Sequence, residues 1–212
     1  MSKIDELVTP AVKNLVALCR KYCTCLEMLK HEERNAFFDE MLVMLPGIYR
    51  GVMRLPQIDK RYAYEPEKFV TERVYKQMRQ RLQEELGAQD RFPMLADPTM
   101  PERMRLSEHS LAEILCDVYQ EVKDFVSLYE RGSLEDMNDA VKECQTNFKD
   151  RLGAQLLSAA YMMHLYRYQP LPDMTHADPD EDMFDEEMIE PEEGSQSEGL
   201  AEPDGYVSFS ED

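Results

Sequence analysis

The sequence lacks several features that would place it outside the soluble interior of a cell. No apolar run approaches the roughly 18 residues that a membrane-spanning helix needs, and the N-terminus MSKIDELVTP has no signal-peptide layout. The five cysteines are odd in number and lack the second Cys or His pair of a zinc site. We therefore expect a cytoplasmic protein without membrane contact, whose reduced cysteines pack as small hydrophobic residues.

Familiar catalytic motifs are missing as well. There is no glycine-rich phosphate loop, Gly-x-Ser-x-Gly elbow or His-Glu-x-x-His motif, and the eight glycines are scattered. We accordingly assign no catalytic residue, expect no cofactor and favour a non-enzymatic protein.

Negative charge is abundant but unevenly distributed. The chain has 43 acidic and 24 basic residues, for a net charge of -19. Residues 170–212 contain 16 of the acids and no Lys or Arg, so residues 1–169 have a net charge of only -3. This composition predicts one folded domain over 1–169 and a disordered acidic tail over 170–212. The tail could screen or dock onto other surfaces, and its acidity argues against nucleic acid as the default partner.

Apolar residues recur at helical spacing through most of residues 1–169. Thr9 precedes Pro10 as a helix N-cap, and a second helix begins near Glu32 and is expected to break or kink at Pro46-Gly47. A third helix extends from about Phe69 to Leu86 and ends at Gly87.

Residues 88–106 contain three prolines and no sustained periodicity, which predicts a long surface loop. Ser107 is expected to cap the next helix, which ends before Gly132. Ser133 and Asp136 then resemble a capping box for a helix over 134–168 that bends near Gly153. The fold class is therefore all-α, a single bundle of five to seven helices.

One polar pattern suggests metal chemistry as an alternative. Glu121 and Asp124, then Asp136 and Asp139, are pairs at i and i+3. All-α nucleotide pyrophosphohydrolases hold magnesium between such pairs on neighbouring helices. The alternative function is thus a magnesium-dependent nucleotide phosphohydrolase, with Mg as cofactor. An exposed helix face explains the same acids.

A basic concentration on the third helix raises a further possibility. Arg73, Lys76, Arg79 and Arg81 could contact RNA phosphates or the acidic tail. The competing explanation is an ordinary exposed face balanced by Glu84 and Glu85.

Several matched stretches resemble a bacterial family known as domain of unknown function 5063. They run from about Val12 to Leu165 and include Asp117-Val-Tyr-Gln-Glu-Val-Lys-Asp-Phe-Val126, Met137-Asn-Asp-Ala140, Cys144-Gln145, Gly153-x-Gln155-Leu156 and His164. The chain departs from the pattern at Arg151-Leu152, where a tryptophan is expected, and at Ala160-Tyr161-Met162.

The resemblance implies a small cytoplasmic helical domain with no assigned activity. It also implies an accessory role in RNA metabolism, since members are often encoded beside a 3'-5' exonuclease and a ribosomal RNA methyltransferase. The matching polar positions form our candidate site: Asp117, Gln120, Lys123, Asp124, Asn138, Asp139 and His164. The same residues could instead form a buried network that fixes the register of the last two long helices.

From these observations we expect a helical interaction module that binds an as yet unidentified protein partner. The 15 methionines favour adaptable apolar contacts. The sequence does not indicate the oligomeric state.

Overall fold

The structure is a computed structural model that describes residues 3–29, 34–63, 65–95 and 106–168. The chain divides into two units, Met1–Pro172 and Asp173–Asp212, and all described residues lie in the first. The acidic segment 170–212, expected to be disordered, lies outside the described residues.

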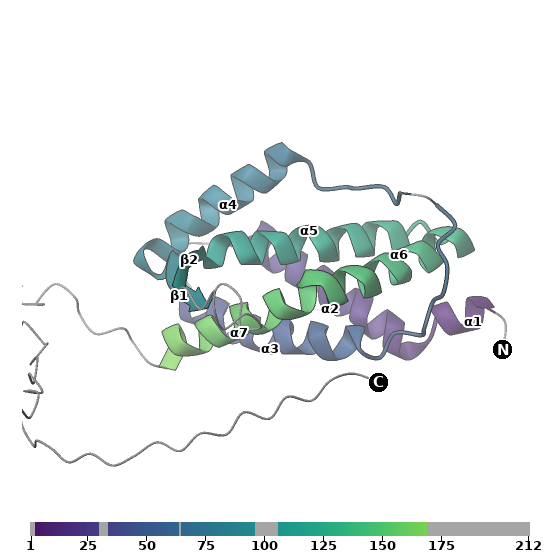
Figure 1. The fold of residues 1–212 in the computed structure, drawn as a ribbon, viewed down its shortest axis with the longest axis horizontal. Coiled ribbons are helices and arrows are strands. Elements are labelled where there is room, and N and C mark those ends of the chain that lie inside the picture. Colours follow the sequence, from purple (N-terminus) through teal and green to yellow (C-terminus); the bar gives the residue numbers. More distant parts are fainter. Residues whose placement is uncertain (1–2, 30–33, 64, 96–105, 169–212) are drawn as a thin grey trace, which may run out of the picture. The chain divides into compact units, whose positions relative to one another are not determined.

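The described residues form a helical bundle with one small hairpin, which confirms the predicted fold class (Figure 1). The helices are α1 (Lys3–Leu7), α2 (Pro10–Glu27), α3 (Arg34–Val52), α4 (Glu72–Leu86), α5 (Leu111–Tyr129), α6 (Leu134–Asn147) and α7 (Gly153–Tyr168). The closest packing is between α3 and α7, between α5 and α6, and between α2 and both α3 and α5. No described helix is both long and apolar enough to cross a membrane.

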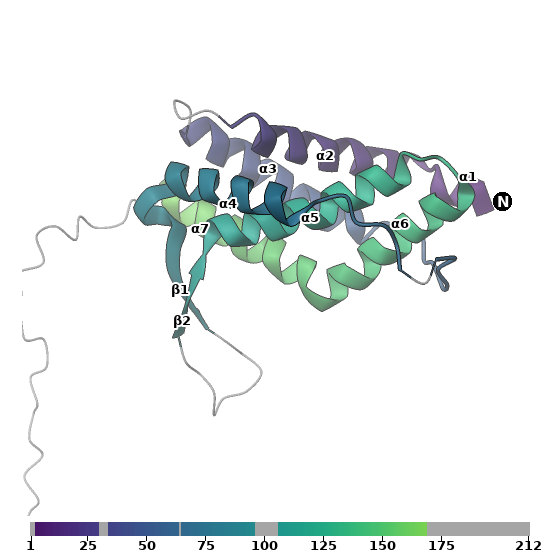
Figure 2. The ribbon, with the colours of Figure 1, turned by 90° about the horizontal axis from the view of Figure 1, so that it is seen from above.

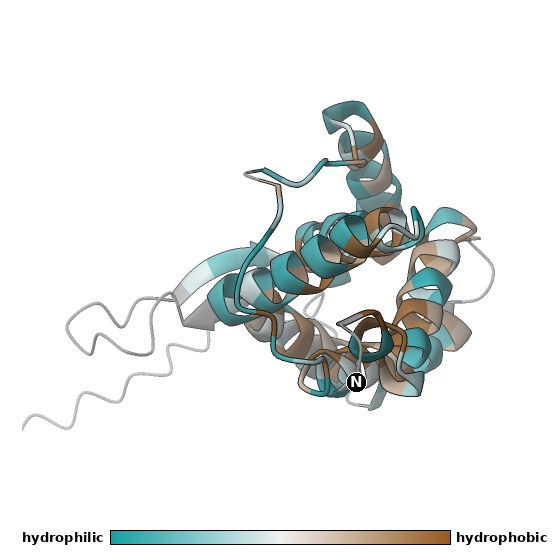
Figure 3. Ribbon diagram, turned by 90° about the vertical axis from the view of Figure 1, so that its right-hand side faces the viewer, coloured by the Kyte–Doolittle hydropathy of each residue, from teal (hydrophilic) through white to brown (hydrophobic). Residues whose placement is uncertain are grey.

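Helix α5 is the central element of the hydrophobic core. Most of its side chains are buried, among them Leu115, Val118, Val122 and Phe125. Figure 3 shows hydrophobic and hydrophilic residues alternating along the helices, as expected when one face of each is buried. All the buried apolar side chains of the described residues belong to one core cluster.

Three predicted helix boundaries are confirmed. The Thr9 hydroxyl accepts a hydrogen bond from the backbone N–H of Val12, and the Ser133 hydroxyl accepts one from Asp136. Gly87 follows the last residue of α4 with a φ of 57°, a conformation that glycine adopts without strain. The residues that end or begin these three helices were therefore readable from sequence alone.

A break or kink was predicted at Pro46-Gly47, and the break is wrong. Helix α3 continues through Pro46 to Val52. Proline removes one backbone hydrogen bond from a helix interior, but Met44, Leu45 and Ile48 on either side are fully buried. Because the exposed Pro46 ring points away from this packed face, core contacts hold the helix together.

The predicted surface loop over 88–106 is also wrong in part. After the short 3-10 helix η1 (Gly87–Asp90), strands β1 (Arg91–Leu95) and β2 (Leu106–Ser110) form an antiparallel hairpin that projects from the bundle (Figure 2). Phe92 is buried and anchors it. Residue Ser107 lies in β2, so the actual N-cap of α5 is Ser110, whose hydroxyl donates to buried Asp90.

The predicted bend near Gly153 is confirmed. Helices α6 and α7 meet at an angle through the π-helical segment η3 (Phe148–Leu152), as Figure 2 shows. A β-carbon on Gly153 would lie 2.9 Å from the carbonyl oxygen of Phe148, so only glycine fits there without a shift. The ring of Phe148 packs against Tyr49 of α3.

Replacing Pro46 by alanine tests how much strain α3 tolerates. Pro46→Ala restores a backbone donor to an exposed helix position, so the free energy of unfolding should rise by about 1–3 kcal/mol. Urea denaturation measures the change, and Val43→Ala, also exposed and one turn earlier, is the control. A Pro46→Ala variant less stable than the parent chain would show that the proline ring is itself needed.

Candidate functional site

The seven predicted site residues do not converge on one pocket. Asp124, Asn138 and Asp139 contact the connection between α3 and α4, residues 53–71, whereas Asp117 and Lys123 contact other partners. His164 is exposed, with its ring 5.0 Å from that of Tyr168. Gln120 is half-buried on α5.

The first group holds the α3–α4 connection in place. The Asp139 carboxylate accepts hydrogen bonds from the backbone N–H groups of Tyr62 and Ala63, each at 2.7 Å. Asn138, fully buried, donates to the carbonyl oxygen of Lys60 at 2.9 Å. Since residues 53–63 and 65–71 of this connection form no helix or strand, side chains must satisfy their inward-facing backbone groups.

Asp124 performs the same task from α5. Its Oδ1 accepts a 2.7 Å hydrogen bond from the backbone N–H of Phe69, and Oδ2 lies 3.7 Å from the Lys68 ammonium. Burial raises the pKa of Asp124, and the Phe69 hydrogen bond and Lys68 act in the opposite direction. The carboxylate is therefore a buried anchor for the connection.

Two residues of this group were missed by the sequence analysis as site candidates. Gln145 donates to the carbonyl oxygen of Pro56 at 2.8 Å and accepts from the backbone N–H of Ile58. Glu143 pairs with Arg61 and Lys68. Their partners lie more than 70 residues away in the chain, so no local spacing could reveal them.

Asp117 belongs to a second, separate group beside the hairpin. It accepts hydrogen bonds from the Tyr75 hydroxyl at 2.6 Å and from the Gln155 amide at 2.8 Å. These side chains join α4, α5 and α7, and burial followed by the Asp117 hydrogen bond raises the Tyr75 pKa.

Asp117 and Gln155 also line an open hollow of about 410 Å³ between β2, α5 and α7. His109 and Glu113 complete its polar wall, and the His109 ring lies 2.7 Å from the Ser107 hydroxyl. The Oε1 atom of Gln155 is buried without a hydrogen-bond partner in the described part of the chain.

Lys123 forms a third contact, between α5 and α2. Its ammonium and the Tyr119 hydroxyl both donate to the Glu27 carboxylate at 2.8 Å. Burial alone would raise the pKa of Glu27, but these two hydrogen bonds outweigh it and lower the pKa. Lys123 is thus a helix-pairing residue.

The four carboxylates of the alternative magnesium site have separate partners. Glu121 accepts hydrogen bonds from Asn147 and Arg151, and Asp136 accepts one from the Ser133 hydroxyl. As shown above, Asp124 and Asp139 bind different backbone groups of the connection. Within the described ranges, no three Asp, Glu, His or Cys side chains are placed to hold one metal ion.

The basic side chains of α4 are largely paired. Arg81 donates to the backbone carbonyl of Glu27, Lys76 pairs with Glu72, and Arg79 lies 3.9 Å from Glu113. The acids that pair with these cations are Glu72 and Glu113, whereas Glu84 accepts a hydrogen bond from Gln80 and Glu85 is buried.

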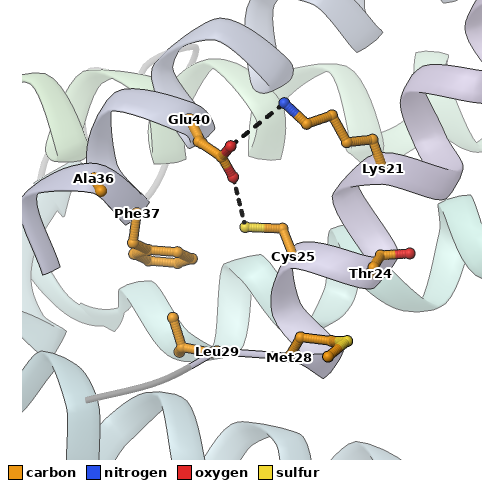
Figure 4. A pocket seen from close by; sticks show the side chains of 8 residues that line it. All are labelled: Lys21, Thr24, Cys25, Met28, Leu29, Ala36, Phe37 and Glu40. Atoms are coloured by element: carbon orange, nitrogen blue, oxygen red, sulfur yellow. Dashed lines mark hydrogen bonds and ion pairs between the residues drawn. The ribbon is translucent and has the colours of Figure 1, made fainter. Parts of the chain in front are cut away.

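An open hollow of about 420 Å³ between α2 and α3 contains the most exposed cysteine (Figure 4). The Cys25 thiol donates to Glu40 at 3.3 Å, and Lys21 pairs with the same carboxylate from the other side. Burial, followed by the Glu40 hydrogen bond, raises the pKa of Cys25 to about 12. A thiol with that pKa is almost fully protonated at neutral pH and is a poor nucleophile.

Comparison with known proteins identifies the family and finds a similar fold. The family model of domain of unknown function DUF5063 matches residues 6–169. The chain belongs to this family. A crystal structure of a Bacteroides fragilis protein from a structural genomics consortium is similar, with a TM-score of 0.67 and 28% sequence identity. The match covers 78% of this chain and 97% of that one. Comparison with curated proteins gave no match.

The thiol chemistry of the α2–α3 hollow can be tested by alkylation. We expect iodoacetamide to modify Cys25 at pH 8 at least about tenfold more slowly in the folded than in the denatured chain. Glu40→Gln should speed the reaction because the lost negative charge lowers the thiol pKa. Lys21→Gln should slow it, since Lys21 lowers that pKa. Mass spectrometry of the Cys25 peptide measures the rates, and equal rates in both variants would contradict the assignment.

The role of Asp139 can be tested by removing its carboxylate. Asp139→Ala leaves the N–H groups of Tyr62 and Ala63 without acceptor, so unfolding should become easier by about 1–3 kcal/mol. Hydrogen exchange at these two amides should accelerate, as measured by NMR. Glu135→Ala, at an exposed site on α6, is the control. If both variants behave alike, Asp139 does not hold the connection.

Proposed function

We propose that this DUF5063 chain is a non-enzymatic helical interaction module that binds another protein. The supporting observation is that its polar side chains form hydrogen bonds within the fold. Asp117, Asp124 and Asp139, the acids of the candidate site, each accept hydrogen bonds that join elements of the fold. No residue of that set is directed with others toward a common point where a substrate could react.

An exposed apolar stripe on α7 supplies the surface for such binding. Leu157, Tyr161 and Tyr168 are 51%, 62% and 58% exposed, and their spacing places them on one side of the helix. Val43 of α3 is 73% exposed. Large apolar and aromatic side chains left in water are typical of the centres of protein interfaces.

Helices α3 and α7 are held side by side, so these residues can act together. Asp39 pairs with Arg167 near the start of α3 and the end of α7, and Tyr49 packs on Phe148 near the opposite ends. The two helices therefore run antiparallel, with Val43 and Tyr161 between the two anchoring contacts. We refer to Val43, Leu157, Tyr161 and Tyr168 as the α3–α7 face.

The family resemblance suggests the cellular setting of this proposal. An accessory role beside RNA-processing enzymes requires only that the module bind a protein of that machinery. Direct contact with RNA through α4 is not needed, and the pairing of its cations does not favour it.

The test is capture of partners from a native lysate by the full chain. Leu157→Asp/Tyr161→Asp should reduce reproducibly captured proteins at least tenfold, because charge on the stripe opposes burial. Asn14→Asp/Ala17→Asp, which adds acids at exposed sites of α2, is the matched control and should capture normally. Quantitative mass spectrometry compares the samples, together with a chain lacking residues 170–212. No protein enriched by the parent chain, or equal capture by both variants, would reject the proposal.

A further inference from the structure

A group of unpaired cations lies at the end of α3 and on the α6–η3 segment. Most Lys and Arg side chains in the described ranges have a carboxylate or carbonyl partner. Those without a hydrogen bond or ion pair through the side chain are Lys13, Arg50, Arg54, Lys60, Arg73, Lys142 and Lys149. All but Lys13 and Arg73 come from two short segments, residues 50–60 and 142–149.

Contacts already described bring these two segments together. Gln145 holds Pro56 and Ile58, Asn138 holds the carbonyl of Lys60, and Phe148 packs on Tyr49. Lys142 on α6 precedes Gln145 by three residues, and Lys149 follows it by four in the π-helical segment η3, so both lie within about one helical turn of Gln145. Arg50 lies in the last turn of α3, next to Tyr49, and Arg54 lies two residues beyond the end of that helix. We refer to Arg50, Arg54, Lys60, Lys142 and Lys149 as the cationic corner.

The acids within the corner do not neutralise it. Glu143 is already paired with Arg61 and Lys68. Asp59 and Asp150 are exposed and form no ion pair with the five cations in the described structure. The corner therefore presents an excess of positive charge, although residues 1–169 as a whole are slightly acidic.

An exposed apolar side chain lies among these cations. Met53, between Arg50 and Arg54 in the chain, is 68% exposed. A nucleic acid backbone would pair with the cations but leave this methionine in water. A peptide in which Asp and Glu are interspersed with apolar side chains would match both features, since carboxylates pair with the arginines and an apolar side chain covers Met53.

We propose that the cationic corner binds an acidic peptide segment of a partner protein, in which carboxylates are interspersed with apolar side chains. This inference deepens the proposed interaction function and names a partner chemistry. It uses a surface distinct from the α3–α7 face, so the two can fail separately.

A peptide with the sequence of residues 178–193, DPDEDMFDEEMIEPEE, has the required chemistry and serves as the probe. Fluorescence anisotropy of the labelled peptide is followed during titration with the full chain. Because the full chain itself contains this sequence, a parallel titration uses residues 1–172, which include the complete matched family domain. Saturable binding to either chain, weakened by added salt, is the expected result.

Charge reversal identifies the surface. Arg50→Glu/Arg54→Glu should weaken binding at least tenfold. Lys13→Glu/Arg73→Glu changes the charge equally at two other unpaired cations and should stay within about twofold of the parent chain. Met53→Ser should weaken binding about threefold through its apolar contact. If reversal disturbs the circular dichroism spectrum, Arg50→Gln/Lys149→Gln replaces it.

Several outcomes would overturn the proposal. These are absence of saturable binding to both chains, equal loss in the Lys13→Glu/Arg73→Glu control, or tighter binding of a single-stranded RNA 20-mer than of the peptide. The Leu157→Asp/Tyr161→Asp variant should bind the peptide normally. Its loss of lysate partners with retained peptide binding would show that the two surfaces act independently.

Discussion

The structure depends on holding the connection between α3 and α4, residues 53–71, whose described residues form no helix or strand. Such a segment cannot satisfy its own backbone hydrogen bonds, and an inward-facing N–H or C=O without a partner is costly. Helices α5 and α6 supply the partners through Asp124, Asn138, Asp139 and Gln145. These contacts place α4 against α5 and determine where the surrounding surface residues lie.

Much of the fold could be predicted because its helices are amphipathic and its caps are local. Thr9, Gly87 and Ser133 make their capping hydrogen bonds within four residues of their own positions, so sequence spacing reveals them. The hairpin could not be predicted in this way. It is held to the start of α5 by Asp90, which accepts hydrogen bonds from the Ser110 hydroxyl and the Ala112 N–H, 20 and 22 residues away in the chain. The helical continuity through Pro46 likewise depends on tertiary packing.

The seven residues of the candidate site stay a prediction as a site, and the structure places only three of them beside one segment. Asp124, Asn138 and Asp139 do act as a polar group, and each contacts the same connection. They were expected to line a site or to form a buried network between the last two long helices. Asn138 does donate to Asp139, but their other hydrogen bonds join backbone groups 55 to 78 residues away in the chain. The same carboxylate and amide side chains can hold a metal ion or can form hydrogen bonds to backbone groups. Which of the two roles applies depends on the groups that face these side chains in the fold, and a single sequence does not show those groups.

This use of the acids makes the proposed binding of an acidic partner compatible with the small net negative charge of residues 1–169. Buried or half-buried carboxylates such as Asp124, Asp139 and Glu143 are engaged by backbone N–H groups and by Lys68 and Arg61. A carboxylate engaged in this way projects little field into solvent, whereas an exposed and unpaired cation projects most of its field. The net charge therefore counts engaged acids and exposed cations equally, whereas the electrostatic field outside the protein comes mainly from the exposed, unpaired charges. Where carboxylates are engaged in hydrogen bonds inside the fold, the exposed cations of neighbouring segments set the charge that a binding partner meets.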